Sequence, residues 1–422
     1  MILQSLGLLV LYIVLHRVGA ASLAVRVWCL IWGTSSFGGI LLEDRAWWIV
    51  SPSMLFLFAL TLALGLGTLA ASPLLSASAA RVKIDSEFNF GLSVRHHRWV
   101  LLACLAPGYL SVHLLLGELG QDYGLFLSGE RLVASAAAAS FARYNDGFDP
   151  APVTRALVTF VYLGAMLAGS LACRTGATGR WWLLLASFVP ALAWATLLTT
   201  KANFLFWLVY ALAGYLAFKP TDATSRPRYW RLVAAAALLA MAVLILMIVT
   251  QANRAGGFDV IDMGHLIDVL AVTAVGHVFA LREWFDHAAS ALPVTFGARN
   301  FAGVIEVLGL GQRELGMYGD DNVYVGGSFT NVYSALRSVI EDLGAPLSVA
   351  AFALLGVLGA LAENSHRPVA RAALAVMLAW LLWSPITSIF AYNSLLLACL
   401  LFVAMAAVGW IPTKRTTWHA SN

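Results

Sequence analysis

The sequence predicts an all-α protein that crosses a membrane many times, and three observations carry that prediction. The 422-residue chain is 60% hydrophobic and has a mean hydropathy of +0.81. Only 11% of its residues are charged, so a single soluble core could not hide the apolar surface. Apolar runs of about 17 to 25 residues recur from end to end, each long enough to cross roughly 30 Å of hydrocarbon as a helix.

These runs predict a polytopic integral membrane protein of about eleven transmembrane helices. The expected spans lie near residues 1–16, 22–41, 47–71, 98–117, 153–173, 181–199, 203–218, 232–250, 346–362, 372–391 and 393–410. The first run has no basic residue before it, and His16 and Arg17 follow it. This order of charge favours an uncleaved span with its N-terminus outside over a signal peptide.

The distribution of charge predicts the orientation. One set of connecting segments holds 16 of the 26 Lys and Arg residues but only 4 of the 22 acidic residues. These segments are residues 16–26, 81–98, 174–180, 219–231, 363–371 and 411–422. By the positive-inside rule we expect this side to be cytoplasmic. The net charge of +4 is then a topology signal, and we expect no nucleic-acid partner.

We interpret residues 1–422 as a single membrane domain with two long outward loops, 118–152 and 251–345. Long loops with structure of their own are usually functional. Within the second, residues 266–287 predict a helix whose uninterrupted apolar core is too short to span. We expect this helix to lie at the membrane surface or to dip partway into it.

A polar stretch, TNVYSALRSVIEDLGAP, precedes one of the last apolar runs. Thr330 is a candidate N-cap, and Gly344 with Pro346 is a candidate stop, so the stretch predicts an amphipathic helix. Its polar face carries Asn331, Ser334, Arg337, Ser338, Glu341 and Asp342, with Tyr333 at the border. We expect the apolar face to rest on the bundle and the polar face to line a cavity or the outward surface. An ordinary interfacial helix is the alternative.

These residues also carry a family resemblance. TNVYSALRSVIEDLG resembles the signature TNVYTxFRxxxxDFG of bacterial oligosaccharide repeat unit polymerases, the Wzy-type polymerases of O-antigen and capsule synthesis. FARYNDGFDPAPVTRALVTFVYLGAMLAG is similar to a second segment of that family, ARYxxGxxxPxxxxLxxxFxYLGxLxGG. PVTFGARNFAGVIEVLG resembles the stretch that precedes the signature in many members.

The resemblance implies a GT-C-like glycosyltransferase of the bacterial inner membrane, with its active face and the large late loop in the periplasm. Such an enzyme moves a growing glycan from undecaprenyl pyrophosphate to the non-reducing sugar of another lipid-linked repeat unit. The implied partners are undecaprenyl-pyrophosphate-linked oligosaccharides, membrane lipids and a chain-length regulator protein. No metal or other cofactor is implied.

That reaction needs a stabilised diphosphate leaving group and an acceptor hydroxyl that loses its proton. Guanidinium suits the first task because its planar fork binds phosphate oxygens and stays charged near lipid. The expected catalytic residues are Arg143, Arg254, Arg299, Arg337, Asp342 and His277. The expected substrate-binding residues are Lys201, Arg282, Tyr144, Asn331 and Tyr333.

Several of these residues have plainer interpretations. Basic residues near span ends are often interfacial anchors, and His277 could be a packing histidine. The general base stays open among Glu341, Asp342 and the histidines of the second loop. Two alternatives to a polymerase also stay open: an O-antigen ligase of the same architecture, and a transporter of lipid-linked oligosaccharide. The scarcity of charges inside the expected spans favours an enzyme over a transporter.

Overall fold

The computed structural model describes residues 2–39, 51–75, 94–145, 148–173, 177–219, 244–245, 247–249, 263–287, 294–311, 323–325, 328–330 and 334–411. Within these ranges the fold is helical apart from one short two-stranded hairpin, which confirms the all-α class. Five helices there are long and apolar enough to cross a membrane, and four more are apolar but shorter. The finer prediction of eleven spans stays a prediction, and most of the expected span 232–250 lies outside the described residues.

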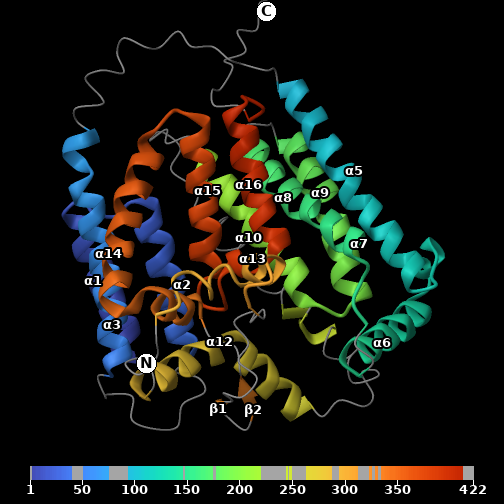
Figure 1. The fold of residues 1–422 in the computed structure, drawn as a ribbon, viewed down its shortest axis with the longest axis horizontal. Coiled ribbons are helices and arrows are strands. Elements are labelled where there is room, and N and C mark those ends of the chain that lie inside the picture. Colours follow the sequence, from blue (N-terminus) through green and yellow to red (C-terminus); the bar gives the residue numbers. More distant parts are fainter. Residues whose placement is uncertain are drawn as a thin grey trace, which may run out of the picture. The chain divides into compact units, whose positions relative to one another are not determined.

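The chain divides into two compact units, whose helices and strands are labelled in Figure 1, and the prediction of a single membrane domain stays a prediction. The first unit comprises Met1–Gly91 and Ala271–Gly409, and the second comprises Leu92–Leu270 and Trp410–Asn422. The first unit contains α1 (Ile2–Arg17), α2 (Leu23–Gly39), α3 (Pro52–Ala70), most of α12 (Met263–His287), α13 (Ala302–Val307), β1 (Val323–Val325), β2 (Ser328–Thr330), α14 (Ala335–Asn364), α15 (Pro368–Trp383), η3 (Ile389–Ala391) and α16 (Asn393–Ala407). The second contains α5 (Val94–Glu118), η1 (Tyr123–Leu127), α6 (Gly129–Asn145), α7 (Pro152–Leu157), α8 (Thr159–Ala172), α9 (Ala177–Leu197) and α10 (Lys201–Phe218).

In the first unit, α3 and α14 are in backbone contact through two glycines. A Cβ atom on Gly67 would lie 1.9 Å from the carbonyl oxygen of Ala353, and one on Gly356 would lie 2.1 Å from that of Leu64. Small residues permit this close approach, which is the usual way that apolar helices associate in lipid. The contact fixes the long helix α14 against α3.

Two buried tryptophans of α2 tie further helices of the first unit together. The indole of Trp28 donates to Thr61 Oγ1 at 2.9 Å, and that of Trp32 donates to Ser384 Oγ at 3.1 Å. The carbonyl of Ser384 accepts the backbone N–H of Ala335 at 2.8 Å. This hydrogen bond joins Ala335, the first residue of α14, to Ser384, the residue that directly follows α15.

The second unit is built around α8, whose side chains are nearly all buried. This helix is apolar on every face and packs against α5, α9 and α10, as expected for a central helix. It too has a glycine contact, because a Cβ on Gly169 would lie 2.0 Å from the carbonyl oxygen of Ala211 in α10. The same kind of glycine contact therefore occurs in both units.

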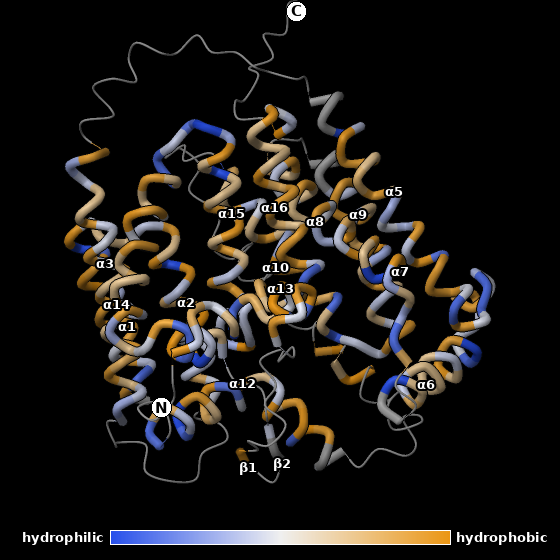
Figure 2. The backbone as a smooth tube through the Cα atoms, in the orientation of Figure 1, coloured by the Kyte–Doolittle hydropathy of each residue, from blue (hydrophilic) through white to orange (hydrophobic). Residues whose placement is uncertain are grey.

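Hydropathy along the backbone separates helix bodies from turns (Figure 2). The turn between α14 and α15 is hydrophilic in that view, and Glu363 lies just before it, in the last turn of α14. One oxygen of Glu363 accepts the Leu23 N–H at 2.7 Å, and the other accepts Arg26 Nη2 at 3.0 Å. The carboxylate therefore meets the first turn of α2, where a negative charge is favoured.

The segment 251–345, predicted as the second outward loop, has more structure in its described residues than its turn-rich sequence indicates. The helix predicted over 266–287 is confirmed as α12. β1 and β2 form an antiparallel hairpin, in which Val323 pairs with Thr330. The prediction that Thr330 caps the next helix is wrong, because Thr330 belongs to this hairpin. The helix starts at Ala335, five residues after Thr330, with Ser334 as its N-cap.

Candidate functional site

The candidate site is organised by a kink in α14. Gly344 has φ 73° and ψ 161°, which interrupts the helix two residues before Pro346. The left-handed φ suits glycine, and proline has no N–H to offer the carbonyl of residue 342. The interruption predicted at Gly344 and Pro346 is therefore present, although the helix resumes at once. Ser348 Oγ donates to the Gly344 carbonyl at 2.7 Å and stabilises the bend.

A second segment, the loop 294–301, docks on the carbonyl groups that the kink leaves without helical partners. The N–H of Thr295 donates to the carbonyl of Glu341 at 2.9 Å, and the N–H of Phe296 donates to that of Asp342 at 3.0 Å. The loop thus takes the place of the next helical turn. Its docking explains why the polar side of this helix lies in the interior.

The Asp342 carboxylate holds the same loop from the side. Its Oδ1 accepts Thr295 Oγ1 at 2.6 Å and the Arg299 N–H at 2.9 Å. Its Oδ2 accepts the Asn300 N–H at 2.9 Å and Asn300 Nδ2 at 2.7 Å. With four donors and 2% exposure, this carboxylate is a structural acceptor in the described state.

Glu341, the neighbouring acid, lies between two arginines. Arg337 Nε donates to its Oε1 at 2.8 Å, and Arg299 Nε lies 3.0 Å from its Oε2. The Glu341 side chain is 3% exposed and that of Arg337 is 6% exposed. Buried charges are expensive unless they are paired, so this contact is essential to the local structure. We call Arg299, Arg337 and Glu341 the arginine cluster.

Helix α12 covers one side of the arginine cluster. The guanidinium carbon of Arg337 lies 5.1 Å from the centre of the Trp284 ring, a cation–π contact. His277 lies two turns earlier on the same helix and is 4% exposed. Burial lowers its pKa to about 4, so the ring is neutral at pH 7. Among the described residues nothing bonds to its Nε2 atom.

The structure therefore brings together Arg299, Arg337 and Asp342 of the predicted site, with His277 and Arg282 on the adjoining helix α12. Arg282 is partly exposed and faces Asp286, with Nε 3.9 Å from Oδ2. Arg143, Tyr144 and Lys201 belong to the second unit. Arg143 is exposed in the last turn of α6, and Lys201 begins α10. Arg254, Asn331 and Tyr333 lie outside the described residues.

The predicted polar face differs from expectation in one respect. Arg337, Ser338, Glu341 and Asp342 are all buried, so none of them faces outward solvent. The loop 294–301 covers Glu341 and Asp342, and Trp284 covers Arg337; periodicity within one helix could not reveal either contact. Sequence reasoning also missed Thr295, Asn300 and Trp284. The only sequence signal for the loop contact is Pro346, whose missing N–H leaves a carbonyl to be satisfied four residues earlier.

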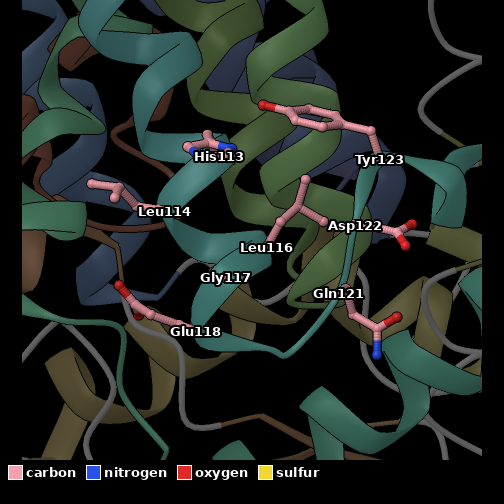
Figure 3. Close-up of a pocket in the computed structure, with 8 residues that line it drawn as sticks. All are labelled: His113, Leu114, Leu116, Gly117, Glu118, Gln121, Asp122 and Tyr123. Atoms are coloured by element: carbon pink, nitrogen blue, oxygen red, sulfur yellow. The ribbon is translucent and has the colours of Figure 1, made fainter.

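A separate hollow of about 500 Å³ lies in the second unit (Figure 3). His113 and Tyr123 stack on one side of it, with ring centres 5.9 Å apart. Glu118, on the other side, accepts hydrogen bonds from the Ala151 N–H and from Thr154 Oγ1. The hollow is mainly apolar and contains none of the predicted site residues, so we place the candidate site in the arginine cluster instead.

Within the described ranges, no group of three or more His, Cys, Asp or Glu side chains is placed to hold a metal ion. The metal independence that the family resemblance implies stays a prediction.

No protein-family model, no curated protein and no solved structure matches this chain. The link to a family rests on the sequence segments quoted above and enters below as a proposal.

Proposed function

We propose that this protein is a polymerase that joins undecaprenyl-pyrophosphate-linked oligosaccharide repeat units into O-antigen, capsule or exopolysaccharide at the periplasmic face of the bacterial inner membrane. One observation carries the proposal. Two sequence segments that resemble this polymerase family, around Arg299 and around Arg337, lie in direct contact through Glu341 and Asp342. Segments that are separate in sequence and meet in space at charged side chains are typical of a site.

The arginine cluster suits the chemistry of the proposed reaction. A bond forms between the acceptor hydroxyl oxygen and the anomeric carbon of the donor glycan, and the bond from that carbon to the diphosphate breaks. The leaving diphosphate takes up negative charge, which the Arg299 and Arg337 guanidinium groups would stabilise. Their mutual contact with Glu341 keeps both groups fixed, so little reorganisation is needed when substrate binds.

The remaining predicted residues have supporting roles in this proposal. Arg143, Arg254, Arg282 and Lys201 would contribute further positive charge, and the side chains of Tyr144, Asn331 and Tyr333 would contact sugar. His277 is a candidate base because no described residue bonds to its Nε2 atom, whereas both oxygens of Asp342 already accept hydrogen bonds. A chain-length regulator is a proposed partner.

The test is reconstitution of the purified protein in liposomes with a lipid-linked repeat unit as the only substrate. We expect wild type to produce a ladder of lengths and Arg337→Ala to leave single repeat units. Arg155→Ala is the matched control, because Arg155 is an exposed arginine outside the cluster and pairs with Asp149. We expect this control to keep the ladder.

A strain that lacks the protein distinguishes the alternatives. Single repeat units on the periplasmic side support the polymerase. Accumulation of full-length polymer on undecaprenyl pyrophosphate would identify a ligase, and repeat units that remain on the cytoplasmic side would identify a transporter.

A further inference from the structure

Glu341 and Asp342 are adjacent carboxylates, and Arg299 contacts both of them. The Arg299 N–H donates to Asp342 Oδ1 at 2.9 Å, while the Arg299 Nε lies 3.0 Å from Glu341 Oε2. We propose that Asp342 is a positioning residue, which holds the backbone of Arg299 so that its guanidinium group meets Glu341. The activity part of its test rests on the proposed function, and the structural part does not.

The surroundings of Asp342 favour this role over proton transfer. Its four donors are the hydroxyl of Thr295, two backbone N–H groups and the amide of Asn300, and all of them come from the loop 294–301. A carboxylate that accepts this many bonds from one segment fixes the path of that segment.

The loop also needs such a support, because part of its backbone is strained. Phe296 has φ 49°, an unfavourable region for a side chain of this size, and Gly297 follows with φ 97°. Strained residues persist only where the surrounding structure over-determines them. The far end of the loop is held separately, by stacking of Phe301 on Phe390 with ring centres 5.8 Å apart. Asp342 therefore supports the intervening residues, including Arg299.

Hydrogen exchange of the purified wild-type protein and its variants tests the structural part without substrate. We expect Asp342→Asn to speed exchange of the amides at 299 and 300, because the amide side chain offers one acceptor oxygen in place of two. Arg299→Ala should leave these amides slow, since only the side chain is lost. Unchanged exchange in Asp342→Asn would overturn the proposal. Asn300→Ala removes a single donor and gives an intermediate rate even where Asp342→Asn folds poorly.

Polymer formation in liposomes tests the link to Arg299. We expect Asp342→Asn to lower kcat by about 10- to 100-fold, the effect of a small misplacement, and to leave the shape of the pH profile unchanged. The double variant with Arg299→Ala should be no slower than Arg299→Ala alone. The proposal is overturned if the double variant lowers kcat by the product of the two single factors. It is also overturned if Asp342→Asn removes the limb of the pH profile that reports a general base.

A matched control is Glu118→Gln, because Glu118 also accepts a backbone N–H and a threonine hydroxyl, but in the second unit. We expect this variant to polymerise like wild type. If wild type itself makes no polymer, the proposed function fails, whereas hydrogen exchange still decides whether Asp342 holds Arg299.

Discussion

Two charged pairs, one in each unit, lie in opposite surroundings. In the first, the side chains of Arg337 and Glu341 are 6% and 3% exposed. In the second, the side chains of Arg155 and Asp149 are 49% and 59% exposed. Exposed pairs contribute little to stability, whereas a buried pair costs several kcal/mol to desolvate and is rarely better than an apolar replacement. In a chain with 11% charged residues, a buried cluster therefore indicates function more than stability.

The largest effect is expected from a substitution in the buried pair. Glu341→Ala removes the carboxylate that both Arg299 and Arg337 contact. We expect the free energy of unfolding to fall by about 3–5 kcal/mol, because the buried Arg337 guanidinium group then loses its counter-charge and the partly exposed Arg299 loses its partner. Asp149→Ala, the exposed control, should cost about 1 kcal/mol or less. Thermal unfolding in detergent measures both, and equal losses would contradict the comparison.

The next effect concerns His277, where burial lowers the pKa from 6.5 to about 4. The unfolded chain binds more protons than the folded protein between these values, so stability falls as pH drops below about 6.5 and the loss is complete near 4. From pH 7 to 5 this residue alone should remove about 2 kcal/mol. Unfolding of wild type and His277→Gln at both pH values measures the loss. Equal pH dependence of the two proteins would show that His277 is not the cause.

The same contrast separates what sequence could predict from what it could not. Hydrophobic runs predicted the helical membrane class, and the break at Gly344 and Pro346 follows from the conformational limits of those residues. The sequence predicts the polar residues of the 335–342 helix as site residues because of their chemical type. It does not predict that they are buried, because their burial depends on the loop 294–301, some forty residues away in sequence. Contacts of that range leave no periodic pattern in either segment.

A third prediction concerns the contact of Arg337 with the Trp284 ring, next to the buried pair. Trp284→Leu keeps an apolar side chain but removes the ring against which Arg337 lies. We expect a loss of about 1 kcal/mol beyond the change in packing, as for a largely desolvated cation–π contact. Trp284→Phe, which keeps an aromatic face, should recover part of that loss. Thermal unfolding of the two variants measures the difference, and an equal effect would assign the role of Trp284 to packing alone.

The smallest effect is expected at the exposed side, from exchanging the partners of the Arg155 and Asp149 pair. The free energy of unfolding of the double variant Arg155→Asp with Asp149→Arg should differ from that of wild type by less than about 0.5 kcal/mol, because both side chains remain in water and keep opposite charges.

The dependence of stability on salt concentration separates the two pairs more sharply than stability at one salt concentration. Raising the ionic strength to about 1 M shortens the screening length to about 3 Å. The small contribution of the exposed pair should vanish, and the cost of Glu341→Ala should persist, since ions do not enter its buried surroundings. A similar salt dependence for both would mean that ions reach the pair of Arg337 and Glu341, and the inference from burial to function would lose its basis.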